Sequence, residues 1–186
     1  MMCRGFMLLE SKRESNFFDV CSGCKGNCCR NARPPLTFRR KQIIEAYLKE
    51  HQIPSKNPFF HAAYIFPKDS DEGYCIFYDK ETRRCLVHPV KPETCVAGPI
   101  TFDINMKSQK IEWYLKKEEI CSLAGAIRKN REELRKHLES AKKEILTLIR
   151  ELDSRALKDI LKIEEPESFK IDEDDLEKGI LDKLTK

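Results

Sequence analysis

The feature that most constrains this chain is a spaced array of cysteines. Eight of the nine cysteines belong to it, and four of these fall within nine residues. The members of the array are Cys21, Cys24, Cys28, Cys29, Cys75, Cys85, Cys95 and Cys121. Thiolates bind soft or borderline metal ions well, and glycine-bearing turns such as those at Gly23 and Gly26 let two sulfurs converge on one ion. The array therefore predicts a metal-binding domain.

No segment of the sequence resembles an export signal or a membrane span. The longest apolar run near the start covers residues 6–9, far shorter than either kind of segment. Charged residues make up 35% of the chain and the mean hydropathy is −0.57. We therefore expect a soluble, cytoplasmic protein with no membrane association. In that reducing compartment, clustered cysteines serve as metal ligands more often than as disulfides, and an odd total of nine also argues against full pairing.

The cysteine spacing leaves the metal open between zinc and iron. Cys21 and Cys24 have the spacing that lets one turn present two sulfurs to one ion, whereas the adjacent side chains of Cys28 and Cys29 are expected to diverge. Eight cysteines suffice for two four-thiolate zinc sites, or for one iron–sulfur cluster with spare thiols. A set of buried free thiols is the alternative, and the density of the array disfavours it.

Other cysteine and histidine residues have weaker claims. Cys3 stands apart near the terminus and is predicted to be incidental. His88 follows Cys85 by three residues, close enough to share its metal, although a histidine at a strand end is more often packed or exposed. His51, His61 and His137 have no cysteine close in sequence and are predicted to lie outside the site.

Residues 1–127 read as a small α+β domain built around the array. Thr37 is a good N-cap for a helix over residues 38–51, and residues 53–67 look irregular. Two β-hairpins are expected, the first from residues 74–78 with 84–88 and the second from residues 100–105 with 110–114. Between the hairpins, a proline-rich loop is expected to fix Cys95.

Residues 128–186 read as a helical extension without cysteines. Apolar residues at three- and four-residue steps predict an amphipathic helix over residues 128–153, followed by a shorter helix over 154–163. An acidic tail at residues 172–175 then leads into a last helix containing Ile180. We interpret the extension as scaffold or interaction surface, which divides the chain at residue 127.

The motif as a whole resembles a known family. The matching residues, in order, are Cys21-x2-Cys24-x3-Cys28-Cys29, then Cys75, then Cys85-x2-His-Pro, then Pro92-x2-Cys95-x3-Pro99. This pattern is similar to that of the YkgJ-like cysteine-cluster family, whose domain also occurs in flagellin lysine N-methylase. The resemblance covers about residues 17–125 and implies a centre that chelates zinc or iron. Lys91 and Val96 stand where the family usually has arginines.

Two other functional classes remain beside the metal-binding protein. The family resemblance allows a protein lysine N-methyltransferase-like enzyme, but the seven glycines form no Gly-x-Gly-x-x-Gly loop for a nucleotide cofactor. Basic stretches at residues 39–41 and 83–84 would suit a nucleic-acid adaptor. The net charge of only +4 makes a solvated surface the better interpretation. The sequence leaves enzyme activity, a protein partner and the oligomeric state open.

Overall fold

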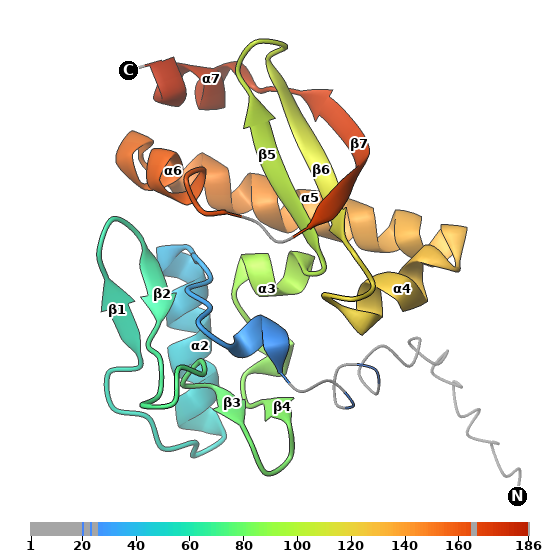
Figure 1. Cartoon of the computed structure of the whole chain (residues 1–186). Helices are drawn as coiled ribbons and strands as arrows, with labels where there is room; N and C mark the ends of the chain where they lie inside the picture. The colour runs from blue at the N-terminus through green and yellow to red at the C-terminus, as the bar shows by residue number, and fades with distance from the viewer. Residues whose placement is uncertain (1–19, 21–22, 24–25, 165–166, 186) are drawn as a thin grey trace, which may run out of the picture.

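The computed structural model describes residues 20, 23, 26–164 and 167–185 of the 186-residue chain. Cys21 and Cys24 therefore lie outside the described residues, as does Cys3. The fold is α+β, as predicted, with short antiparallel sheets and two groups of helices (Figure 1). Within the described part of the chain, no helix combines the length and the apolarity needed to cross a membrane.

The smaller layer of the molecule carries most of the cysteines. Its elements are η1 (Asn27–Cys29), α2 (Phe38–Glu50), β1 (Phe59–His61), β2 (Ile65–Pro67), β3 (Tyr78–Asp79), β4 (Arg84–Cys85), η2 (His88–Val90) and α3 (Glu93–Ala97). A compact apolar cluster that includes Leu36, Ile44 and Phe77 holds them together. The predicted start of α2 is confirmed, because the Thr37 hydroxyl accepts a hydrogen bond from the Arg40 amide at 3.0 Å.

Three local predictions in this layer need correction. Residues 53–67 contain the hairpin β1–β2, in which Phe59 is buried while Phe60 points to solvent. The hairpin expected at residues 74–88 shrinks to two residue pairs, because the Cys75 amide instead donates to the Cys29 carbonyl at 2.7 Å. The proline-rich loop is mostly helical, and it contains η2 and α3.

The larger layer is a three-stranded sheet packed on a long helix (Figure 1). Its elements are β5 (Ile100–Asn105), β6 (Lys110–Lys116), α4 (Ser122–Arg128), α5 (Arg131–Glu151), α6 (Ser154–Ile160), β7 (Ser168–Asp175) and α7 (Lys178–Thr185). Alternate residues of β6, with Trp113 at the centre, are buried in one core with Ala141, Ile145 and Leu148 of α5. The predicted second hairpin and the helices of the extension are thus confirmed.

The acidic run at residues 172–175 is a strand and not a tail. It belongs to β7, which pairs antiparallel with β6. Lys142 of α5 lies 2.7 Å from both Asp172 and Asp174, and the Trp113 indole donates to Asp174 at 2.7 Å. Because these partners offset the negative charge, the segment can join the sheet.

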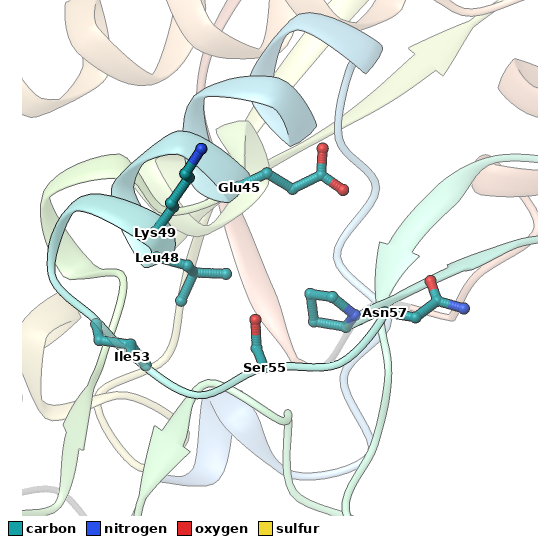
Figure 2. Close-up of a pocket in the computed structure, with 7 residues that line it drawn as sticks. Glu45, Leu48, Lys49, Ile53, Ser55 and Asn57 are labelled. Carbon is teal, nitrogen blue, oxygen red and sulfur yellow. The ribbon is translucent and has the colours of Figure 1, made fainter.

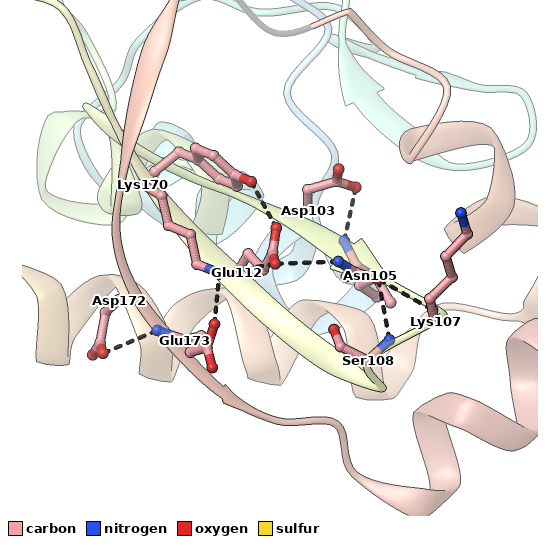
Figure 3. A network of polar contacts seen from close by, with 10 residues as sticks. Asp103, Asn105, Lys107, Ser108, Glu112, Lys170, Asp172 and Glu173 are labelled. Carbon is pink, nitrogen blue, oxygen red and sulfur yellow. Dashed lines mark hydrogen bonds and ion pairs between the residues drawn. The ribbon is translucent and has the colours of Figure 1, made fainter.

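A second charge network covers the outer face of the sheet (Figure 3). Lys170 contacts Glu112 at 2.9 Å and Glu173 at 2.6 Å, and the Tyr114 hydroxyl donates to Glu112 at 2.7 Å. Ion pairs of this kind, which water screens, contribute little to stability. The network therefore fixes the register of β7 more than it stabilises the fold.

The larger core draws side chains from both sides of residue 127. Trp113 and Ile127 share one buried cluster with Ile145, Leu157 and Ile180. The division of the chain into residues 1–127 and 128–186 stays a prediction. The helices of the extension nevertheless bury their apolar faces against β5, β6 and α4.

Candidate metal centre

A knuckle over residues 26–31 brings the adjacent cysteines beside Cys75 in the smaller layer. Gly26 precedes η1 with φ +71°, and the Cys29 amide donates to the Gly26 carbonyl at 2.8 Å. The Asn31 amide donates to the Gly73 carbonyl at 2.6 Å, and the Cys75 amide to the Cys29 carbonyl. These backbone bonds place the knuckle directly beside Cys75.

Two further cysteines reach the same region from other segments. Cys85 lies opposite Tyr78 in the β3–β4 pair, and the Tyr78 amide donates to the Cys75 carbonyl at 2.8 Å. Cys95 lies in the middle of α3. The thiols of Cys28, Cys75, Cys85 and Cys95 are close enough for their charges to interact. Four segments that are distant in sequence therefore converge.

Burial and mutual repulsion keep three of these thiols protonated in the metal-free protein. Burial raises the pKa of Cys75 to about 12, and charge on Cys85 adds to the effect. The pKa values of Cys85 and Cys95 are also raised, again mainly by burial. A bound cation reverses this balance, because it favours the thiolate form of every sulfur around it.

The adjacent pair of Cys28 and Cys29 converges, contrary to the expectation from sequence. Their Sγ atoms lie 3.9 Å apart. Two sulfurs that bind one tetrahedral ion with bonds of about 2.3 Å are separated by about 3.8 Å. The pair therefore has the spacing of two ligands to a single ion.

The two sulfurs of the pair also lie within hydrogen-bonding distance, and either thiol can be the donor. A hydrogen bond from the Cys29 thiol lowers the pKa of Cys28 to about 6, and the nearby charges of Lys91 and Lys116 act in the same direction. The same hydrogen bond raises the pKa of Cys29. The two groups titrate as a unit, in which Cys28 ionises first. The hydrogen bond within the pair thus favours ionisation of the Cys28 thiol.

The structure brings five of the eight predicted ligands into one neighbourhood, namely Cys28, Cys29, Cys75, Cys85 and Cys95. Within the described ranges, no group of three or more His, Cys, Asp and Glu side chains is close enough to enclose an ion. Cys121 is the residue immediately before α4, and it packs against the larger core. Val20 packs against the same core. His88 is the first residue of η2, and burial lowers its pKa.

A buried polar network next to Cys95 was not predicted from the sequence. Glu93 is 1% exposed, and it accepts a 2.7 Å hydrogen bond from the Thr37 hydroxyl. Arg40 Nε lies 3.6 Å from the same carboxylate, and its Nη2 lies 2.5 Å from Glu144. The other oxygen of Glu93 is buried and has no hydrogen-bond partner among the described residues. The N-cap at Thr37 was visible in the sequence, but its link to Glu93 was not.

A hollow of about 270 Å³ lies between the C-terminal half of α2 and the segment that leads to β1 (Figure 2). Glu45, Lys49, Ser55 and Asn57 are among the side chains around it. The described residues that line it include no cysteine and no histidine. The hollow is therefore separate from the cysteine centre.

The family of the chain follows from its cysteine-bearing segment. The model of the CxxCxxCC family, described as "Putative zinc- or iron-chelating domain", matches residues 20–124. This is more than half of the chain, which belongs to that family. All eight cysteines of the array fall in the matched segment. The match confirms the predicted relationship and supports metal binding. No solved structure matches the chain.

Gly26→Ala is expected to destabilise the protein by about 1–3 kcal/mol, because the position requires a left-handed backbone. A Cβ atom there would also lie 2.5 Å from the Tyr78 ring. Gly23→Ala is the matched control, because a Cβ atom at Gly23 meets nothing within 4 Å. Urea unfolding followed by circular dichroism compares the two variants. Equal midpoints for both would contradict the assigned role of Gly26.

Proposed function

We propose that this protein binds zinc or iron through the thiolates of its cysteine array. The centre is built on the Cys28–Cys29 pair, with Cys75, Cys85 and Cys95 as the surrounding donors. Cys21 and Cys24, which precede the pair in the sequence, supply further ligands. Cys121 completes the donor set from the start of α4.

One observation carries the proposal. Five thiols from four segments gather in one region, and for four of them, Cys29, Cys75, Cys85 and Cys95, burial and mutual repulsion oppose ionisation. Such an arrangement is costly for free thiolates and favourable around a cation. The 3.9 Å spacing of the Cys28 and Cys29 sulfurs fits two thiolate bonds to one zinc or iron ion.

The number of thiols favours more than one metal atom. A closed zinc site uses four ligands, and the proposed donor set has twice that number. The two arrangements it supports are a pair of ions and an iron–sulfur cluster with additional thiols. In both, Lys91 and Lys116 offset part of the negative charge near Cys28.

Purification without oxygen, followed by elemental analysis and a visible absorption spectrum, tests the proposal. We expect at least one equivalent of zinc or iron per chain. Iron with acid-labile sulfide and broad visible absorption identifies a cluster, whereas zinc in a colourless protein identifies thiolate zinc sites. A chain that contains neither metal, and that takes up neither when reconstituted under reducing conditions, would contradict the proposal.

A further inference from the structure

Helix α3 carries Cys95 but cannot hold its own position. It spans five residues, Glu93–Ala97, and isolated helices of this length are not stable in water. Within it, the Val96 amide donates to the Pro92 carbonyl and the Gly98 amide to the Thr94 carbonyl. The place of Cys95 therefore depends on the elements that pack against α3.

Helix α2 holds one side of α3. Thr37 donates to Glu93, and the Thr94 hydroxyl donates to the Pro35 carbonyl at 3.3 Å. Arg40 donates to the Lys91 carbonyl at 3.1 Å, just before α3 begins. These contacts come from the family domain itself, and they fix the first turn of the helix.

Helix α5 of the extension holds the other side. His137, Ala141 and Glu144 are spaced by four and three residues, so they share one face of α5. Ala141 is fully buried, and its small side chain lets α3 pack closely. Glu144 binds Arg40 of α2, the residue that donates to the Lys91 carbonyl just before α3. His137 Nε2 lies 3.2 Å from the Ala97 carbonyl oxygen and 3.1 Å from that of Gly98, at the end of α3.

The chemistry of His137 suits this position. Carbonyl oxygens only accept hydrogen bonds, so Nε2 carries a proton and donates to both. The last carbonyl groups of a helix have no partner within the helix, and His137 supplies one. Burial lowers the pKa of His137, which leaves the ring neutral at neutral pH.

We propose that His137 is a positioning residue of the metal centre, holding the C-terminal end of α3 and thereby the Cys95 thiol. The proposal rests on the proposed function. It assigns a role at the centre to a residue beyond the segment matched by the family model, which ends at residue 124. It also revises the prediction that His137 has no connection to the site.

Two substitutions in the full chain separate this role from a general effect on stability. His137→Leu removes the donor, whereas His137→Gln keeps an N–H group that can reach the same carbonyls. Ile180→Val is the control, because it removes one carbon atom from the larger core, to which α5 also contributes. The described hydrogen bonds of α3 do not involve α7, which contains Ile180. Each protein is loaded with zinc, and the rate of zinc loss to a chelator is measured. Cobalt(II) is loaded separately, because its thiolate absorption bands report the sulfur ligands.

We expect His137→Leu to lose zinc about 10-fold to 100-fold faster than the wild type, as outer-shell substitutions at metal sites do. Its cobalt spectrum is expected to shift. His137→Gln should recover most of the wild-type rate, and Ile180→Val should match the wild type in both readouts. Equal zinc loss from His137→Leu and Ile180→Val would overturn the proposal.

Amide hydrogen exchange of the metal-free proteins keeps the two proposals distinguishable. His137→Leu should speed exchange at the Val96 and Gly98 amides, whatever the metal content. A wild type that binds no metal, together with faster exchange in His137→Leu, would refute the proposed function. The role of His137 in holding the end of α3 would still stand. Unchanged exchange at both amides would refute the role of His137 in holding α3.

Discussion

Cys95→Ser is expected to weaken metal binding at least about 100-fold, since even residues outside the ligand shell cost about 10-fold to 100-fold. Cys95 is the thiol that α3 carries into the cysteine cluster, and its charge interacts with those of Cys75 and Cys85. Serine keeps the size of the side chain but replaces the thiolate with a hydroxyl group that remains protonated. Metal content after dialysis against a weak chelator measures the effect.

Cys3→Ser is the matched control for this experiment. Cys3 lies outside the family match and was predicted to be incidental. We expect this variant to retain the metal content of the wild type. Circular dichroism of both variants separates loss of a ligand from loss of the fold, which metal binding links thermodynamically. Full metal content in a folded Cys95→Ser variant would remove Cys95 from the ligand set.

Arg40→Met is expected to lower the free energy of unfolding by about 3–5 kcal/mol, the usual cost of removing one partner of a buried ion pair. The Arg40 side chain is 17% exposed, and it joins Glu93, Glu144 and the Lys91 carbonyl. Without it, the buried Glu93 carboxylate keeps its hydrogen bond from Thr37 but loses its cationic partner. Since whole domains are stabilised by about 5–15 kcal/mol, the loss is a large part of the total.

Arg39→Met provides the comparison for Arg40→Met, because Arg39 is the exposed neighbour on the same turn of α2. It should remain within about 0.5 kcal/mol of the wild type. In the double variant Arg40→Met/Glu93→Gln, part of the lost stability should return, because the buried carboxylate is then neutral. Urea unfolding gives all three values. A similar small effect in both single variants would show that Arg40 behaves as a surface charge.

The two results would together describe how the centre is held. Cys95→Ser changes the metal without touching the supporting network, whereas Arg40→Met changes that network without removing a thiol. If Arg40→Met also releases metal in its folded fraction, the network and the centre are coupled through α3. Retained metal in the folded fraction would place the role of Arg40 in stability alone.

The regular elements follow from local sequence signals. Thr37 caps α2, the alternating apolar residues of β5 and β6 form a hairpin, and the helical periodicity after residue 128 forms α5 and α6. Each depends on neighbours a few residues apart. The acidic run of β7 was misjudged because two of its partners, Lys110 of β6 and Lys142 of α5, are distant in sequence and meet it only through the sheet and the helix beneath.

The amino-acid sequence alone determined the family of the chain and predicted a metal-binding domain, because the cysteine count and spacing are local properties that need no fold to recognise. The tertiary structure decided which thiols meet. Backbone bonds from the knuckle to residues 73–75 seat Cys28 and Cys29 beside Cys75, and α3 brings in Cys95. The tertiary structure also decided that Arg40 contacts Glu93 at the start of α3 and that His137 contacts the carbonyl groups at its end. Contacts between residues 40 to 104 positions apart arise only from packing, so no periodicity or motif encodes them.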